Sequence, residues 1–215
     1  MKGIFFEDFK NSYIPNILKE VYLDQAYAPI LHGRKDLTIV DVGANIGLTS
    51  FYFYDYASKI YSLEPAQQHF NVMKHMITFN KMDDRIIPIN KALSHENGKA
   101  TFYHNENVTM FSLNGAVNSQ PDKAEEVETI TFDKLFEEQG ITHVDMLKLD
   151  VEGAEHEIIG SRGFDLVADK IDVIMGEHHA WSGKNPDQFR TAFIDRGFNF
   201  QWIPNEAQLF IAKRI

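Results

Sequence analysis

LTIVDVGANIG, residues 37–47, is the stretch of sequence that decides the fold. Residues 37–42 are mostly apolar and β-branched, which predicts a buried strand. Gly43 and Gly47 follow, and glycines let the backbone turn tightly and approach a ligand closely. A helix is expected from about residue 46 to residue 57, so its N-terminus lies at the turn, where a nucleotide can be cradled. The stretch therefore predicts a strand, a turn and a helix with a ligand site at the turn.

Strands and helices alternate on both sides of this unit. We expect further strands at residues 59–63, 85–90, 100–104, 127–130, 144–149 and 171–175, and a closing hairpin at 198–202 and 209–212. Helices are expected at residues 7–27 (interrupted by Pro15), 66–80, 131–139, from about 153, and 186–196, with residues 105–123 a loop over the site. The alternation predicts an α/β fold with a sheet of about seven mostly parallel strands, helices on both faces and a C-terminal antiparallel hairpin. Ligands of such sheets bind beyond the carboxyl ends of the strands.

Composition limits the partners. The chain has 215 residues, a formal net charge of −10 and no cysteine. The length suits one domain, and the missing cysteines exclude disulfides and thiolate metal sites. Because nucleic-acid binding needs a basic face, the acidic charge disfavours a nucleic acid, and it also disfavours an anionic membrane surface. With no transmembrane run and no signal peptide in the sequence, we expect a cytoplasmic protein.

Glu64 is the second candidate ligand-binding residue. It ends the second expected strand, roughly 20 residues after the glycine turn, which is the spacing at which dinucleotide folds place an acid on the ribose hydroxyls. Pro65 adds a rigid apolar edge for an adenine. Asn45 stands where GxGxxG motifs have a small residue, and its polarity suits a ligand with hydrogen-bonding groups of its own, such as the amino-acid end of S-adenosylmethionine. Alone, each feature is also compatible with an ordinary strand-to-helix turn or a solvated acid.

KLDVEGAEHEIIG, residues 148–160, supplies candidate catalytic acids. Asp150 follows a hydrophobic strand, Glu152 comes two residues later, and both are expected to face the cleft of the glycine turn. An alternative is that these acids cap a helix N-terminus, with Glu155 and Glu157 solvated on that helix. Glu177 and His178 follow the next strand and can join the same cleft, although His178 alone is also compatible with a structural histidine. We therefore name Asp150, Glu152, Glu177 and His178 as candidate bases.

Taken together, these motifs resemble the FkbM family of S-adenosylmethionine-dependent methyltransferases. The resemblance rests on VDVGANIG (40–47), EP (64–65), NKALS (90–94) and LKLDVEGAE (147–155). It implies a Rossmann-like class I methyltransferase fold and S-adenosyl-L-methionine as the cofactor. It also implies a set of cofactor-binding residues, with Glu64 on the ribose and residues 90–92 near the adenine: Asp41, Gly43, Ala44, Asn45, Gly47, Glu64, Pro65, Asn90, Lys91, Ala92 and Asp150.

The implied reaction is transfer of a methyl group to a small-molecule acceptor, expected to be a hydroxyl of a sugar or secondary metabolite. Residues 1–36 are expected to form a helical cap and residues 37–215 the methyltransferase domain. Three alternatives stay open: a nicotinamide-dependent oxidoreductase, a non-catalytic module that binds the cofactor, and a metal-assisted version of the transfer, although we assign no metal ligand. The acceptor and the oligomeric state, with a homodimer one possibility, are not readable from the sequence.

Overall fold

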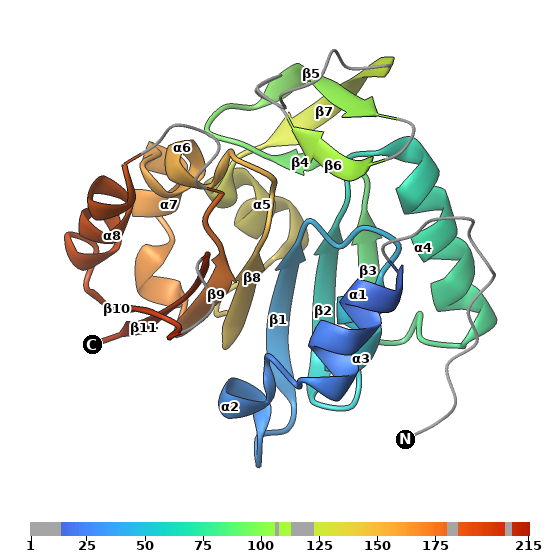
Figure 1. Cartoon of the computed structure of the whole chain (residues 1–215), viewed down its shortest axis with the longest axis horizontal. Helices are drawn as coiled ribbons and strands as arrows, with labels where there is room; N and C mark the ends of the chain where they lie inside the picture. The colour runs from blue at the N-terminus through green and yellow to red at the C-terminus, as the bar shows by residue number, and fades with distance from the viewer. Residues whose placement is uncertain (1–13, 106–107, 113–122, 180–184, 205–207) are drawn as a thin grey trace.

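The computed structural model describes residues 14–105, 108–112, 123–179, 185–204 and 208–215 (Figure 1). A seven-stranded sheet forms its centre, with the strand order β10-β11-β9-β8-β1-β2-β3. The strands are β1 (Leu37–Val42), β2 (Ala57–Leu63), β3 (Ile86–Ile89), β8 (Met146–Leu149), β9 (Val173–Glu177), β10 (Phe198–Trp202) and β11 (Leu209–Arg214). All neighbouring pairs are parallel except those that involve β11, which runs antiparallel to both β9 and β10. The predicted α/β class, the mostly parallel sheet and the C-terminal hairpin are confirmed.

Strand β1 lies in the middle of the sheet, between β2 and β8. Five of its six residues are buried, because helices cover both faces of the sheet at this point. The register with β8 places Asp41 beside Lys148 and Val42 beside Leu149. The two strands therefore end together, and the loops that follow them meet at one edge of the sheet.

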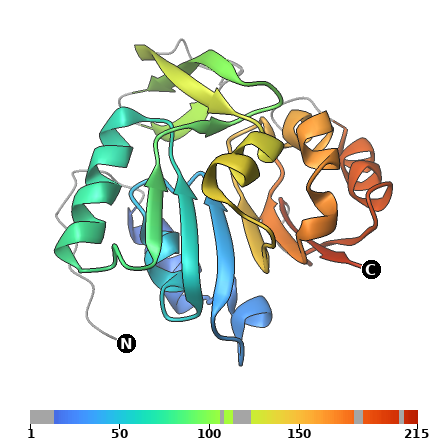
Figure 2. The same cartoon turned by 180° about the vertical axis from the view of Figure 1, so that it is seen from behind.

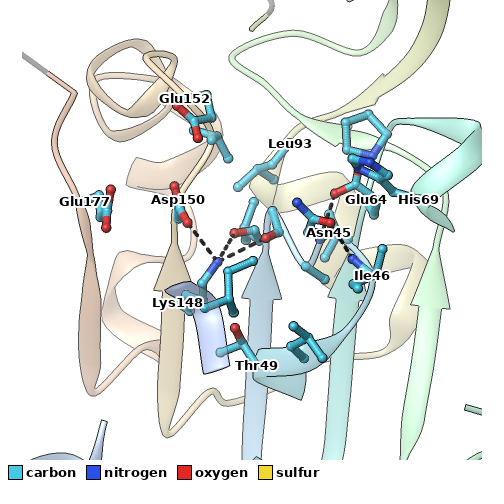
Figure 3. Close-up of a pocket in the computed structure, with 18 of the residues that line it drawn as sticks. Asn45, Ile46, Thr49, Glu64, His69, Leu93, Lys148, Asp150, Glu152 and Glu177 are labelled. Atoms are coloured by element: carbon cyan, nitrogen blue, oxygen red, sulfur yellow. Dashed lines mark hydrogen bonds and ion pairs between the residues drawn. The ribbon is translucent and has the colours of Figure 1, made fainter. Parts of the chain in front are cut away.

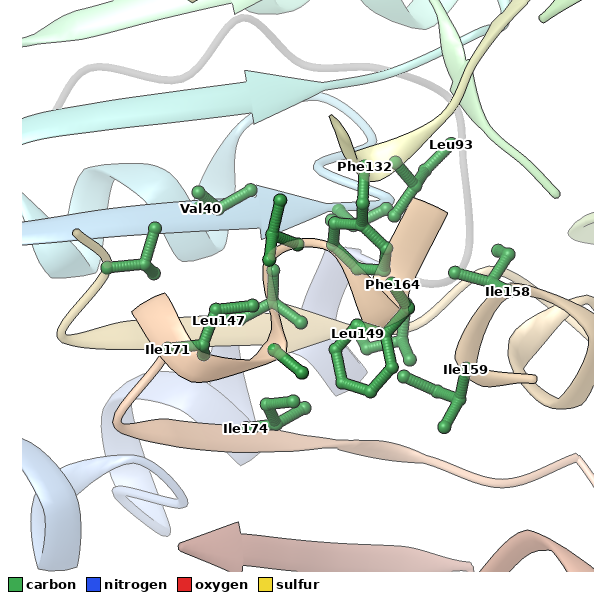
Figure 4. Close-up of a cluster of buried hydrophobic side chains, with 14 of the residues drawn as sticks. Val40, Leu93, Phe132, Leu147, Leu149, Ile158, Ile159, Phe164, Ile171 and Ile174 are labelled. Atoms are coloured by element: carbon green, nitrogen blue, oxygen red, sulfur yellow. The ribbon is translucent and has the colours of Figure 1, made fainter. Parts of the chain in front are cut away.

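Helices pack on both faces of the central sheet (Figures 1 and 2). They are α3 (Leu48–Phe53), α4 (Gln67–Phe79), α5 (Phe132–Gln139), α6 (Glu155–Ile159), α7 (Arg162–Asp165), the short 3₁₀ turn η2 (Ala168–Lys170) and α8 (Pro186–Ile194). One apolar core joins α5 to α8 to the sheet, and Figure 4 shows Phe132 and Phe164 of this core beside Leu147 and Leu149 of β8. A second core joins α3 and α4 to the opposite face. Burial on both faces explains why the central strands read as nearly continuous apolar runs.

A second sheet of four strands lies over the carboxyl ends of the central strands (Figure 1). It has the order β4-β7-β5-β6, with β4 at Ala92–Leu93, β5 at Gly98–Asn105, β6 at Val108–Ser112 and β7 at Lys123–Ile130. The strands predicted at 100–104 and 127–130 are present, but the prediction of a continuous loop at 105–123 is wrong for residues 108–112. Residues 106–107 and 113–122 of that prediction lie outside the described residues. The pairing of β5 with β7 is long-range, and such pairing cannot be read from local composition.

The described part of the N-terminal segment packs against α3. It contains α1 (Ile14–Leu18), the π-helical turn η1 (Lys19–Leu23) and α2 (Ala28–Leu31). Pro15, expected to interrupt a helix, is the second residue of the described part of α1. The predicted helix before residue 14 lies outside the described residues. Val21 and Leu31 are buried in the same core as α3 and α4. Across the described ranges, no helix combines the length and apolar character needed to cross a membrane.

Candidate functional site

A cavity of about 290 Å³ opens at the carboxyl ends of β1, β2 and β8 (Figure 3). Its wall combines separate parts of the chain: the N-terminal segment, the turns after β1, β2 and β8, the end of β9, and residues of the second sheet. Most of the predicted site residues line it: Gly43, Ala44, Asn45, Glu64, Pro65, Lys91, Ala92, Asp150, Glu152 and Glu177. The N-terminal segment adds Asn16, Ile17, Glu20, Val21 and Tyr27.

The turn after β1 has a backbone that only small or turn-forming residues tolerate. Gly43, Asn45 and Gly47 have φ angles of 77°, 52° and 92°. Left-handed φ values are free of steric cost for glycine and are tolerated by asparagine. The side chain of Asn45 also stabilises the turn, because its Oδ1 accepts a hydrogen bond from the backbone N–H of Ile46 at 2.8 Å. The φ values and this hydrogen bond together fix the path of the turn along the cavity wall.

Glu64 is a buried carboxylate whose two oxygens both accept backbone hydrogen bonds. Oε2 accepts from the N–H of Asn45 at 2.8 Å, and Oε1 accepts from the N–H of Ala66 at 2.9 Å. Burial raises the pKa of Glu64 to about 7, although the N–H groups of Ala66 and Asn45 oppose that rise. Each oxygen keeps a further lone pair, so the carboxylate can accept hydroxyl donors from a ligand. The hydrogen bond to Asn45 links the turn after β1 to the end of β2.

Lys148 lies in the cavity wall and joins the glycine turn after β1 to the turn after β8. Its Nζ lies 3.4 Å from Asp150 Oδ2 and donates to the carbonyl oxygen of Gly43 at 3.1 Å (Figure 3). It also lies 3.5 Å from Oδ1 of the buried Asp41. The other carboxylate oxygen of Asp41 accepts a hydrogen bond from Ser50 Oγ at 2.6 Å. Burial by itself lowers the pKa of Lys148, but the carboxylates of Asp150 and Asp41 outweigh it and raise that pKa. Lys148 therefore stays charged and ties the two loops together.

A second group of carboxylates surrounds His179 at the far side of the cavity. His179 Nε2 lies 3.2 Å from Glu152 Oε2 and 3.4 Å from Glu177 Oε2, and Nδ1 lies 2.7 Å from Glu155 Oε1. Burial and the neighbouring carboxylate of Asp150 raise the pKa of Glu152 to about 8, although the cation of His179 opposes the rise. Glu155, expected to be solvated, is only 1% exposed because its carboxylate turns inward to His179.

His178 does not reach the cavity. It packs between Phe189, with 4.8 Å between the ring centroids, and Trp202, at 5.7 Å. Successive residues of an extended chain point to opposite faces, so Glu177 and His179 share one side while His178 faces the other. The geometry therefore gives no support to the catalytic role predicted for His178 and favours the alternative of a structural histidine. The same alternation in the sequence could have identified His179.

Three other predicted site residues lie behind the cavity wall and do not line it. Asp41 is fully buried and acts on the cavity through Lys148. Asn90 donates hydrogen bonds to the carbonyl oxygens of Glu64 and Pro65, both at 2.9 Å, so it braces the turn after β2. Gly47 is close to the side chains of Met73 and Phe51, where an added Cβ would lie 3.0 Å from each. These residues shape the site without facing its interior.

Sequence reasoning missed Lys148, the role of Glu155, His179 and the N-terminal lining residues. Lys148 is two residues before Asp150, and period-two alternation places both on one side of the strand. For the lining residues of α1 and η1, the sequence carries no comparable signal, because no motif connects them to the glycine turn.

Two groups of side chains within the described ranges have the spacing of metal ligands. They are His143, Asp145 and Asp172, and Asp150, Glu155 and His179, with ligand atoms within 4.8 Å of one another. In the first group Asp145 already accepts from Arg34 at 2.8 Å. In the second the imidazole of His179 lies among the carboxylates and engages them through both nitrogens. We assign neither group to a metal.

Comparison with known proteins identifies relatives of this site and fold. The family model described as "Methyltransferase FkbM domain" matches residues 41–200, which include the glycine turn, Glu64 and the acids that follow β8. Methyltransferase sdnD of Sordaria araneosa is 26% identical over 235 residues, covering 92% of this chain and 89% of that protein. The 31-O-demethyl-FK506 methyltransferase FkbM of Streptomyces tacrolimicus is 24% identical over 232 residues, covering 93% and 86%.

Solved structures share the fold at low sequence identity. Methyltransferase FkbM from Methylobacillus flagellatus KT superposes with a TM-score of 0.60 and 12% identity over 91% of this chain, which spans about half (47%) of that chain. An rRNA methylase from Streptococcus thermophilus has a TM-score of 0.54 at 9% identity, covering 91% of this chain and 96% of that one. M. capricolum TrmK, solved with S-adenosyl-homocysteine, has a TM-score of 0.52 at 9% identity, covering 89% and 66%.

Proposed function

Since the chain belongs to the FkbM family of methyltransferases, we propose that it transfers the methyl group of S-adenosyl-L-methionine to a hydroxyl group of a small molecule. One observation carries the proposal. The glycine turn and the buried carboxylate of Glu64 are joined by a hydrogen bond of 2.8 Å and line the same cavity. A carboxylate in this place suits ribose hydroxyls, and a tight glycine turn with a polar Asn45 suits the amino-acid end of the cofactor.

The residues around the cavity fit the parts of this cofactor. A Cβ on Gly43 would collide with the backbone of Asp150, so glycine is what lets the two loops meet at the cavity wall. Pro65, Leu93 and Phe102 offer apolar surface for an adenine beyond Glu64. The cofactor-binding set that we propose is Asp41, Gly43, Ala44, Asn45, Gly47, Glu64, Pro65, Asn90, Lys91, Ala92 and Asp150, of which Asp41, Gly47 and Asn90 act from behind the wall. When bound, the cofactor supplies an activated methyl group.

A small hydroxyl compound is the acceptor that we propose. The name of the Streptomyces tacrolimicus relative, 31-O-demethyl-FK506 methyltransferase, describes methylation at an oxygen of a natural product, although that relative is only 24% identical. The chain carries a formal net charge of −10, and Glu20, Glu152 and Glu177 line the cavity. The acidic net charge and the acidic residues of the cavity both disfavour a polyanionic acceptor such as RNA. The N-terminal cap of residues 1–36 adds lining residues to the methyltransferase domain of residues 37–215, so we propose that the cap helps to select the acceptor.

The protein must orient the acceptor in line with the methyl group and remove its proton. Orientation alone can supply about 7–11 kcal/mol of the barrier. Among Asp150, Glu152 and Glu177 we propose Glu152 as the proton acceptor. The carboxylate of Asp150 is already engaged by Lys148, 3.4 Å away, whereas burial raises the pKa of Glu152 to about 8, close to a working pH. Glu152 also has a φ of 54°, a strained value of the kind that clusters at functional sites.

Calorimetry with S-adenosyl-homocysteine tests the cofactor. We expect heat of association with the purified protein, and no heat with a nicotinamide dinucleotide. A folded protein that gives no heat with S-adenosyl-homocysteine contradicts the proposal. Release of S-adenosyl-homocysteine from S-adenosylmethionine is then measured with a panel of alcohols and amines. Turnover with alcohols supports a hydroxyl acceptor, turnover with amines alone contradicts it, and binding without any turnover favours a non-catalytic module.

A further inference from the structure

The turn that carries Glu152 is held by a carboxylate that faces away from the cavity. Glu155 Oε1 accepts hydrogen bonds from the backbone N–H groups of Val151 at 3.2 Å and Gly153 at 3.1 Å. These two residues flank Glu152, whose φ of 54° is unfavourable for a residue with a side chain. Glu155 therefore supports the strained conformation from inside the protein.

The same carboxylate also orients His179. Glu155 Oε1 lies 2.7 Å from His179 Nδ1, and both residues are buried, with exposures of 1% and 5%. With Nδ1 held, the other ring nitrogen points toward the acids that line the cavity, nearest to Glu152 at 3.2 Å. A carboxylate that fixes one nitrogen of an imidazole in order to direct the other is a common orienting arrangement in proteins.

We propose that His179 and Glu155 form a positioning pair that holds the Glu152 carboxylate at the cavity wall, where it accepts the proton of the acceptor hydroxyl. The inference rests on the proposed function and adds two residues to it. Glu155 fixes the backbone of Glu152, and the N–H of His179 Nε2 holds its side chain. The proton passes from the acceptor oxygen to an oxygen of Glu152, and His179 neither gains nor loses one.

The charges around the pair fit this division of roles. Burial by itself lowers the pKa of His179, but hydrogen bonds to Glu155 and Glu177, together with Glu152, raise it to about 11. His179 is therefore an imidazolium at neutral pH and donates from both nitrogens. Burial and the carboxylates of Asp150, Glu177 and Glu155 raise the pKa of Glu152, and the cation of His179 lowers it. Without His179 the carboxylate would hold its proton more tightly and would be a poorer acceptor near neutral pH.

The test is a pair of NMR titrations on the full chain. Side-chain ¹³C signals of glutamate identify Glu152 as the signal that is lost in Glu152→Gln, and ring ¹⁵N signals report on His179. In the wild type we expect the ring signals of His179 to shift as Glu152 titrates near pH 8, and this shift to vanish in Glu152→Gln. If the ring ¹⁵N signals of His179 do not shift while Glu152 titrates, the proposal is overturned. This measurement needs no variant of His179.

Two variants then separate the two contacts of the ring. His179→Asn can still donate to Glu155 but removes the contact with Glu152, whereas His179→Gln reaches toward Glu152 and loses Glu155. Both lack the cation, so we expect the Glu152 signal to titrate at higher pH in each, with unchanged affinity for S-adenosyl-homocysteine. His95→Asn, at an exposed histidine, is the control and should leave both the titration of the Glu152 signal and the affinity unchanged.

An unchanged Glu152 titration in folded His179→Asn overturns the proposal. Failure of the wild type to bind S-adenosyl-homocysteine would instead overturn the proposed function, and it leaves the titrations interpretable.

Discussion

A Cβ atom added to Gly43 would lie 1.8 Å from the carbonyl oxygen of Asp150. The turn after β1 and the turn after β8 are therefore in contact through backbone, without room for any side chain between them. This contact brings Asp150 and Glu152, which follow β8, to the cavity beside the glycine turn. Gly43 is thus required both for its φ of 77° and for the close approach.

Replacing Gly43 with alanine should destabilise the protein by at least about 4 kcal/mol, because strain at φ and a steric clash add. Gly33 provides a matched control, since it has the same φ of 77° and no atom within 4 Å of an added Cβ. Gly33→Ala should lower the free energy of unfolding by about 1–2 kcal/mol, because it introduces backbone strain without a clash. Urea unfolding monitored by circular dichroism measures both. Equal losses in the two variants would show that the contact with Asp150 does not matter.

Glu64→Gln should weaken binding of S-adenosyl-homocysteine by roughly 10- to 100-fold, because hydrogen bonds to a charged group contribute about 1.5–3 kcal/mol. Glutamine keeps the size of the side chain but loses the charge. Calorimetry measures the affinity, and the melting temperature checks the fold. Glu96→Gln, at a side chain that is 77% exposed, is the control. Wild-type affinity in folded Glu64→Gln would remove Glu64 from the cofactor site.

Cofactor binding should strengthen as pH rises through neutrality. Burial raises the pKa of Glu64 to about 7, so the ionised form, which accepts two donors, is the minor form at pH 6 and the major form at pH 8. If only that form binds well, the affinity for S-adenosyl-homocysteine should rise roughly tenfold over this interval. Calorimetry at a series of pH values gives the curve. A comparable rise in Glu64→Gln would assign the effect to another group.

Lys148→Met should destabilise the protein by about 3–5 kcal/mol, because it leaves the buried carboxylate of Asp41 without its cation. Adding Asp41→Asn to this variant should recover part of the loss, since the uncompensated charge is then gone. Free energies of unfolding for the wild type, both single variants and the double variant complete a double-mutant cycle. Additive losses would mean that Lys148 and Asp41 do not interact.

Glu152→Gln should lower kcat by about 10²- to 10⁴-fold, the usual contribution of a positioned base, while the affinity for S-adenosyl-homocysteine is retained. The measurement uses an alcohol that the wild type methylates. Glu177→Gln is the matched control, because it removes a similar carboxylate from the same wall. A large loss of kcat in Glu177→Gln with no loss in Glu152→Gln would assign the role of proton acceptor to Glu177 instead of Glu152.

The sequence by itself determined the order of the central elements and the residues of the glycine turn. Local signals suffice for these, since the apolar runs of β1 and β8 follow from burial on both faces and the positions of Gly43 and Gly47 follow from backbone geometry. Tertiary structure alone decided that residues 108–112 form a strand and that Glu155 turns inward. Alternation along residues 177–179 predicts that His179 shares the side of Glu177, but only the tertiary structure brought Glu152 and Glu155 to it. Each of these depends on which distant segment lies alongside, and no local propensity encodes the partner of a strand or of a buried charge.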